Sequence, residues 1–242
     1  MFDMLPVRTV ASAAWMEGVA VSTASSQFKL GPASLTEALF ASLRERIING
    51  DIAPGEKVTE QRVAGEYGVA RPTAKACLER LTGLGLLRRT AHRSASVPML
   101  DAAEIEDLFF SRETFESAAA AHLASEQNLT DEIARAQTSM RQAAEREDFR
   151  DQVQCDIDFH WALVRGVRSD RIARMYEVIA GEIHLTMGQY AAHRRTSPTT
   201  VVSEHDAIMD AIRAGDVDAA RGALADHLGR ARERVLAQLA GG

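Results

Sequence analysis

Apolar side chains recur every three to four residues along most of the chain, which is the spacing of one face of an α-helix. The first such stripe begins just after Ser34, a residue placed to cap a helix together with Glu37 three positions later. The pair Pro54-Gly55 then predicts a turn. The stripe of this first helix comprises Leu35, Leu39, Leu43, Ile47 and Ile48.

Two shorter helices and a β-hairpin are predicted next. One helix is expected from about 59 to 67, ending at Gly68, and a second from 71 to about 82, since proline is tolerated in a first turn. Residues 86–89 and 95–97 then have the character of two short strands joined by a polar loop. A helix, a short helix, a tight turn, a second helix and a hairpin, in this order, predict a winged helix-turn-helix.

The rest of the chain is predicted to be helical throughout. Six helices with short connections indicate an antiparallel bundle. The fold class is therefore mainly α, with an N-terminal winged helix-turn-helix over residues 34–98 and a C-terminal all-α helical bundle over 99–242. Residues 1–33 lack sustained periodicity, and we expect a disordered leader or, in part, the product of an upstream start codon. The six helices are expected near 101–126, 130–147, 149–166, 169–190, 199–214 and 216–239.

The charge distribution adds a candidate partner. The whole chain has a net charge of −6, but residues 34–98 carry ten Lys and Arg against seven Asp and Glu, a net of +3. Residues 99–242 carry sixteen against twenty-five, a net of −9. Within 71–93 six basic residues face one acid. A basic patch of this kind binds phosphates by releasing counterions, so the first module is expected to bind nucleic acid.

The sequence also excludes the membrane and secreted classes of protein. No apolar run approaches the roughly 18–20 residues of a membrane span. The N-terminal segment lacks a basic region followed by a clean apolar one, which excludes a signal peptide. Two cysteines, Cys77 and Cys155, do not make a disulfide framework. A cytoplasmic location is expected.

The second helix of the helix-turn-helix is the candidate recognition helix, because the major groove of DNA admits one α-helix. Arg71 and Lys75 are four residues apart and project from one face of it. The loop with His92 and Arg93 is placed where a wing contacts the minor groove or the backbone. The alternative is a solvated, arginine-rich face on a generic helical domain. The candidate DNA-binding residues are Gln61, Arg71, Thr73, Lys75, His92 and Arg93.

The segment GEKVTEQRVAGEYGVARPTAKACLERLTGLGLLRR, residues 55–89, resembles the DNA-binding module of GntR-family transcription regulators. The chain departs from the family pattern at three places: Ala70 stands for a Ser or Thr that caps the helix, Pro72-Thr73 inverts the common Thr-Pro, and Lys75 replaces an arginine. These departures bear on the operator sequence. The positions in register are Gly55, Glu60, Ala64, Gly68, Val69, Arg71, Leu78, Leu81, Gly85 and Leu86.

Ionisable residues interrupt the apolar stripes of the second module. Buried charges are costly unless they are paired or bind a metal. Asp156 and His160 are four residues apart and face the same way, while His205 and His227 are equidistant from the turn at Asp216. Three imidazoles and one carboxylate suit Zn²⁺ first, and Ni²⁺ or Mn²⁺ with added water. The alternative is a set of isolated core histidines, each with its own hydrogen bond.

The segments RETFESAAAAHLA (112–124), DIDFHWALV (156–164) and EHDAIMDAIRAGDVDAARGALADHL (204–228) resemble the FadR C-terminal, or FCD, effector domain. The resemblance implies a divalent metal on the same Asp and three His, and a small organic acid as effector with Arg112 in the matching arginine position. Arg112 and Glu116, one turn apart on the same stripe, are the candidate effector-binding residues. The resemblance also implies a homodimer on pseudo-palindromic double-stranded operator DNA.

The leading hypothesis is therefore a ligand-responsive transcriptional repressor, not an enzyme, whose helical domain senses a carboxylate metabolite. Two alternatives remain. A metal-dependent hydrolase or lyase on the helical domain would use the metal to activate water, with Glu116 or Glu182 as the candidate general base. A purely structural metal would leave DNA binding constitutive. Turnover of a metabolite would favour the hydrolase or lyase. DNA binding that is unaffected by metabolites and chelators would favour the structural metal.

Overall fold

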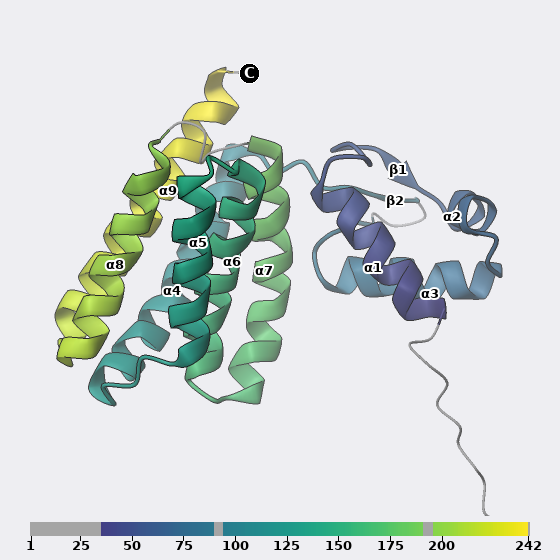
Figure 1. Cartoon of the computed structure of the whole chain (residues 1–242). Helices are drawn as coiled ribbons and strands as arrows, with labels where there is room; N and C mark the ends of the chain where they lie inside the picture. The colour runs from purple at the N-terminus through teal and green to yellow at the C-terminus, as the bar shows by residue number, and fades with distance from the viewer. Residues whose placement is uncertain (1–34, 90–93, 191–195, 242) are drawn as a thin grey trace, which may run out of the picture. The chain divides into compact units, whose positions relative to one another are not determined.

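The computed structural model describes residues 35–89, 94–190 and 196–241. The expected leader and the wing-loop residues His92 and Arg93 lie outside this part of the chain. Helices form nearly all the regular structure that is described (Figure 1). The mainly α fold class is confirmed.

The described residues of the first module form three helices and two very short strands. The side chain of Thr59 caps the second helix by accepting a hydrogen bond from the backbone N–H of Arg62 at 3.1 Å. Gly68 ends this helix with a φ of 64°, a left-handed conformation that glycine adopts without steric cost. The elements are α1 (Leu35–Ile48), β1 (Lys57–Val58), α2 (Glu60–Tyr67), α3 (Arg71–Gly83) and β2 (Ala95–Ser96).

The hairpin differs from the prediction. β2 pairs antiparallel with β1, with Lys57 opposite Ser96, and not with a strand over 86–89. Of that predicted strand only Arg88 pairs, in an isolated bridge to Ser96. The reason is local: the N–H groups of Leu86 and Leu87 both bond to the carbonyl of Leu81, so the chain is still turning at the end of α3. β1, only two residues long, was not predicted.

The second module consists of six helices whose observed ends lie within two residues of the predicted ones. Asp101 and Glu104 form a reciprocal capping box at the first of them. The helices are α4 (Ala102–Ser125), α5 (Asp131–Glu145), α6 (Phe149–Gly166), α7 (Asp170–Tyr190), α8 (Pro198–Ala214) and α9 (Val217–Gly241).

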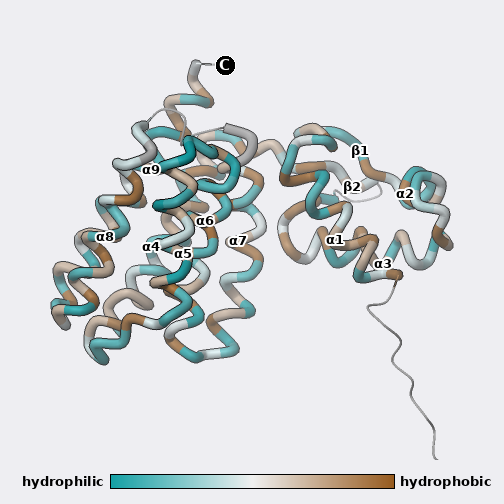
Figure 2. Tube along the Cα trace, viewed as in Figure 1, coloured by the Kyte–Doolittle hydropathy of each residue, from teal (hydrophilic) through white to brown (hydrophobic). Residues whose placement is uncertain are grey.

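Most buried apolar residues of each module cluster with others of the same module, and Leu185 of α7 belongs to the cluster of the first module. In Figure 2 hydrophobic and hydrophilic positions alternate along the helices, as amphipathic helices around a core require. In the first module Leu39, Leu43 and Ile47 are buried as predicted, whereas Leu35, the first residue of α1, is 64% exposed and Phe40 is buried in addition. The main cluster of the bundle runs from Leu100 to Val235. Within the described residues, no helix has both the length and the apolar character that a bilayer span demands.

Candidate metal centre and DNA-binding surface

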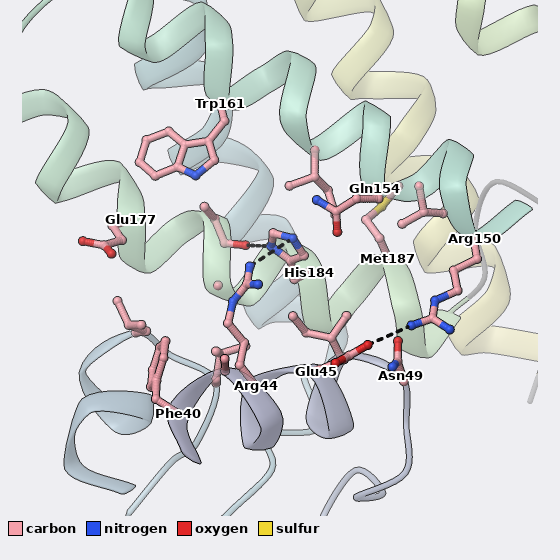
Figure 3. Close-up of a pocket in the computed structure, with 18 of the residues that line it drawn as sticks. Phe40, Arg44, Glu45, Asn49, Arg150, Gln154, Trp161, Glu177, His184 and Met187 are labelled. Atoms are coloured by element: carbon pink, nitrogen blue, oxygen red, sulfur yellow. Dashed lines mark hydrogen bonds and ion pairs between the residues drawn. The ribbon is translucent and has the colours of Figure 1, made fainter. Parts of the chain in front are cut away.

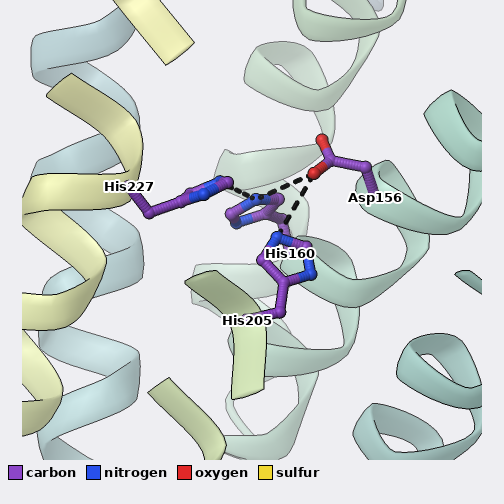
Figure 4. Close-up of side chains that lie close together, drawn as sticks. All are labelled: Asp156, His160, His205 and His227. Carbon is purple, nitrogen blue, oxygen red and sulfur yellow. Dashed lines mark hydrogen bonds and ion pairs between the residues drawn. The ribbon is translucent and has the colours of Figure 1, made fainter. Parts of the chain in front are cut away.

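Four ionisable side chains meet inside the helical bundle (Figure 4). Asp156 and His160 come from α6, His205 from α8 and His227 from α9. Each is at most 1% exposed, and one ligand atom from each lies within 4.8 Å of the others. The structure therefore brings together the four residues that the sequence predicted as metal ligands.

The register of α8 and α9 aligns two of these residues. Gly215 ends α8 with a φ of 74°, and Oδ1 of Asp216 then accepts a hydrogen bond from the N–H of Ala219 at 2.9 Å. The tight turn sends α9 back along α8, so residues equidistant from Asp216 lie at the same height. His205 and His227, each eleven residues from Asp216, thus face the same point.

The distances between ligand atoms match those around one metal ion. Nε2 of His160 lies 3.1 Å from Nε2 of His227, and Oδ1 of Asp156 lies 3.2 Å from Nε2 of His205 and 3.8 Å from Nε2 of His160. Ligands about 2.1 Å from a tetrahedral ion lie about 3.4 Å apart. The residues present fit a divalent metal.

Two carboxylates determine which nitrogens face the centre. Nδ1 of His160 lies 2.5 Å from Oε2 of Glu116, and Nδ1 of His227 lies 2.7 Å from Oε2 of Glu204. Nδ1 of His227 donates its proton to Glu204, because an ionised carboxylate only accepts hydrogen bonds. Nδ1 of His160 is in close ion-pair contact with Glu116, and a proton on this nitrogen makes that contact favourable. In neutral rings this leaves two Nε2 lone pairs facing each other at 3.1 Å. A cation between them removes that repulsion.

The third imidazole is positioned by packing. The ring of His205 stacks on Phe159, with centroids 3.9 Å apart and planes inclined by 13°. Phe159 is fully buried and comes from the same helix as Asp156 and His160. The stack fixes the plane of the His205 ring against the carboxylate of Asp156.

The electrostatic environment favours the metal-binding form of the ligands. Burial is the main reason that the pKa of His227 falls to about 3; the hydrogen bond to Glu204 raises the pKa, and the neighbouring imidazoles of His205 and His160 lower it. Burial opposes ionisation of Glu204, but the hydrogen bond from His227 and the nearby arginines lower its pKa to about 2. A neutral imidazole backed by an ionised carboxylate is the arrangement that binds divalent metals.

The candidate effector residues lie beside this centre as an ion pair. Arg112 Nε donates to Oε1 of Glu116 at 3.0 Å, and the Tyr176 hydroxyl donates to the same oxygen at 2.6 Å. Burial alone raises the pKa of Glu116, but Arg112 and His160 outweigh it and hold the pKa well below its usual range. The guanidinium of Arg112 also interacts with Tyr176, but its Nη2 is buried and no described residue lies in hydrogen-bond geometry with this atom. An unpaired guanidinium N–H inside a protein is a position for an anionic ligand.

The candidate DNA-binding residues that the structure describes lie on the first module. Gln61 on α2 and both Arg71 and Lys75 on α3 are exposed, and Thr73 is half-buried. Nζ of Lys75 lies 3.8 Å from Glu79, an exposed pair that leaves the ammonium accessible. Gln61 and Arg71 line one small hollow of about 330 Å³. As expected from its sequence, α3 begins at Ala70 without a side-chain cap.

Comparisons with known proteins match each of the two modules to a known family. Residues 35–97 match the family described as bacterial regulatory proteins, gntR family, and residues 107–230 match the FCD domain. The chain belongs to the GntR family. It is a transcriptional regulator with a GntR DNA-binding domain and an FCD effector domain.

Relatives of this GntR regulator extend over most of its length. An HTH-type transcriptional regulator in an unstable DNA locus of Streptomyces ambofaciens is 27% identical over 78% of this chain and 80% of its own. The HTH-type transcriptional repressor RspR of Escherichia coli is 24% identical over 83% and 89%. A GntR transcriptional regulator from Rhodococcus sp. RHA1 has a solved structure that superposes with a TM-score of 0.72, at 26% identity over 84% and 97%.

The two acids considered as general bases for a hydrolase are both in contact with other side chains of the regulator. Glu116 is engaged by Arg112, Tyr176 and His160. Glu182 lies elsewhere: its side chain packs against Gly85, and Oε1 is 3.9 Å from Nη2 of Arg88. No finding favours the hydrolase alternative.

The sequence patterns do not identify one buried acid beside the cluster. Glu204 is 7% exposed and backs His227, yet it was not singled out as a polar residue of the apolar stripe. A signal was present, since Glu204 directly precedes His205 in a stripe containing Val201 and Val202.

His184, a buried histidine of α7, is not one of the four residues of the cluster. It lines an open pocket of about 1230 Å³ formed by residues of α1, α6 and α7 (Figure 3). Nδ1 of His184 donates to the carbonyl of Ala180 at 2.8 Å, and Nε2 lies 3.4 Å from Nη2 of Arg44. None of the four cluster residues lines this pocket.

Proposed function

We propose that this GntR-family regulator is a repressor that holds a divalent metal with Asp156, His160, His205 and His227 and is released from its operator by a small organic acid. The observation that carries the metal assignment is the pair of Nε2 atoms 3.1 Å apart, each on a ring whose Nδ1 faces a carboxylate. Zn²⁺ is the first candidate, and Ni²⁺ and Mn²⁺ are the alternatives.

The acid is proposed to bind at Arg112. Its Nη2 is buried and has no acceptor among the described residues, while its Nε is already occupied by Glu116. A divalent metal supplies a Lewis-acidic centre for a carboxylate oxygen when it is bound. The arginine contributes a charge-assisted hydrogen bond to the same ligand, and burial excludes the water that would weaken it. This combination favours a small carboxylate over a neutral metabolite.

The DNA half of the proposal places α3 in the major groove. Arg71, Thr73 and Lys75 are proposed to contact bases or phosphates, with Gln61 beside them and His92 and Arg93 on the wing. A homodimer would present two such helices to a pseudo-palindromic operator, with half-sites about one helical turn apart. The repressor assignment is supported by the name of the E. coli relative, and a cytoplasmic location suits binding to chromosomal DNA.

Elemental analysis of the purified protein tests the metal. Wild type exposed to Zn²⁺, Ni²⁺ or Mn²⁺ and then desalted is expected to retain one ion per chain. His205→Ala and His227→Ala are expected to lose it, because each removes one of four ligands. His122→Ala, at an exposed position of α4, is the matched control and should retain it. Wild type without stoichiometric metal would overturn the shared-ion assignment.

Effector release is tested on an operator selected from a random duplex library. Mono- and dicarboxylic acids are titrated into the complex while fluorescence anisotropy follows bound DNA. A releasing acid is expected to raise the melting temperature of the metal-loaded protein and lower its operator affinity, because it stabilises one conformation. Arg112→Ala should retain metal and lose most of the response. Release unaffected by Arg112→Ala would exclude this arginine as the acid-binding group.

A further inference from the structure

Glu116 is in contact with both parts of the proposed sensor. Its Oε2 lies 2.5 Å from Nδ1 of His160, a proposed metal ligand. Its Oε1 accepts hydrogen bonds from Nε of Arg112 and from the hydroxyl of Tyr176. Glu116 is fully buried, so neither oxygen is exposed to bulk solvent. One carboxylate thus connects the acid-binding arginine to the metal centre.

Glu204 provides an internal comparison, because it backs His227 in the same way. Its Oε2 lies 2.7 Å from Nδ1 of that ring, while its Oε1 accepts from Nε of Arg230, whose side chain is 48% exposed. The second oxygen of Glu204 therefore faces a solvated arginine. The second oxygen of Glu116 faces a buried one with an unpaired N–H. A largely buried arginine, Arg234, also lies near Glu204, but its Nη2 is 3.8 Å from Oε2, whereas Nε of Arg112 donates to Glu116 at 3.0 Å. Glu116 therefore holds its buried arginine by a hydrogen bond, and Glu204 does not.

We propose that Glu116 is a positioning residue shared by metal and acid: Oε2 fixes the ring of His160 for the metal, and Oε1 holds Arg112 so that Nη2 is left for the acid. This inference rests on the proposed function. It assigns Glu116 to the residues that support a metal ligand and the acid-binding arginine, and not to the residues that contact the acid itself. The metal and the acid both depend on the carboxylate of Glu116, so binding of either one raises the affinity of the protein for the other. Thermodynamic linkage makes the two increases in affinity equal.

The amide of glutamine separates the two roles of the carboxylate. Glutamine has a single acceptor oxygen, so at position 116 it accepts from His160 or from Arg112, but not from both. Glu116→Gln is therefore expected to weaken metal binding and to remove the coupling. Glu204→Gln removes the same kind of support from His227 and leaves Arg112 unchanged, which makes it the matched control.

The experiment uses the full chain with Co²⁺ as the metal and acetate as the acid. The visible spectrum of bound Co²⁺ reports its coordination, and Co²⁺ affinity is measured in sodium acetate and in sodium chloride of equal ionic strength. In wild type, acetate is expected to raise Co²⁺ affinity several-fold. Loss of a carboxylate behind a ligand typically lowers metal affinity about 10–100-fold, so both Gln variants should bind more weakly. Acetate should still strengthen binding in Glu204→Gln but no longer in Glu116→Gln.

A variant and two controls keep the outcomes distinct. Glu116→Asp retains two acceptor oxygens and should recover part of the affinity lost in Glu116→Gln, which a general loss of folding would not allow. If wild type binds Co²⁺ and Glu116→Gln binds it equally well, or if acetate leaves wild-type affinity unchanged, the shared role of Glu116 is wrong. If wild type binds no Co²⁺, the proposed function itself fails.

Discussion

The imidazole of His205 lies almost parallel to the ring of Phe159, and the centroids of the two rings are 3.9 Å apart. His205 therefore differs from the other two imidazoles of the cluster, which face carboxylates through Nδ1. An aromatic surface restrains the ring plane without adding charge. The centre thus combines two electrostatically supported rings with one that is held by packing.

Phe159→Leu is expected to lower metal affinity several-fold, because leucine fills most of the space but offers no flat surface to His205. Stability of the metal-free protein should fall by about 1–2 kcal/mol, as for other buried shape changes. Chelator competition and urea unfolding measure the two effects. Phe40→Leu, at a buried position of the first module, should lose comparable stability and keep its metal affinity. Equal metal affinities in both variants would rule out the stack as a restraint.

Arg71→Ala is expected to weaken binding to a selected operator by about 1–3 kcal/mol and to relax base preference at one position of each half-site. Arg71 is exposed on the first turn of α3, where a side chain reaches a base edge. Anisotropy titrations on operator and random duplexes measure the effect. Arg165→Ala, in the second module and paired with Glu132, is the control. An equal loss on both duplexes would make Arg71 a phosphate contact.

Gly68→Ala should destabilise the helix-turn-helix by about 1 kcal/mol, because a side chain is strained at its φ of 64°. The turn that positions α3 should also loosen, which lowers operator affinity. Gly65→Ala, three residues earlier, gives the opposite expectation: its backbone is helical, a Cβ meets nothing within 4 Å, and alanine should stabilise α2 by about 1 kcal/mol. Thermal unfolding of both variants would show opposite signs, and a shared sign would refute the strain argument.

His184→Gln should make stability less sensitive to acid. Burial lowers the pKa of His184 to about 4, against about 6.5 in an unfolded chain. Between pH 6.5 and 4 the unfolded state takes up a proton that the folded state refuses, so stability falls as pH falls, by at most about 1.4 kcal/mol per pH unit. Urea unfolding at pH 7 and pH 5, both with chelator, gives the slope. Parallel slopes in variant and wild type would exclude this contribution.

Local patterns were sufficient to predict the helices and the convergence of Asp156, His160, His205 and His227. Stripes such as Ile157, Trp161 and Val164 define a face, and any ionisable residue on that face must point inward. Helical geometry alone then places Asp156 and His160, four residues apart, on one face of a helix. It also places His205 and His227, equidistant from their turn, at the same height.

What the sequence did not predict depends on contacts between distant segments. β1 forms because Lys57 and Val58 meet β2, and nothing within two residues indicates a strand. Residues 86 and 87 have strand-forming side chains, but their N–H groups bond to Leu81 at the end of α3. The role of Glu204 depends on the position of His227, 23 residues away, and that of His184 on Arg44.

The turn at Gly215 and Asp216 imposes a constraint on how this chain can vary. One residue added or removed between His205 and the turn rotates that histidine by about 100° and shifts it by about 1.5 Å. The same holds between the turn and His227. The segment 206–226 therefore has a fixed length. Its residues can be substituted as long as the helical phase between His205 and His227 is kept. Insertions are expected to be tolerated before α8 or after α9, and a single-residue deletion at Arg213 should abolish metal binding although it lies two turns from the nearest ligand.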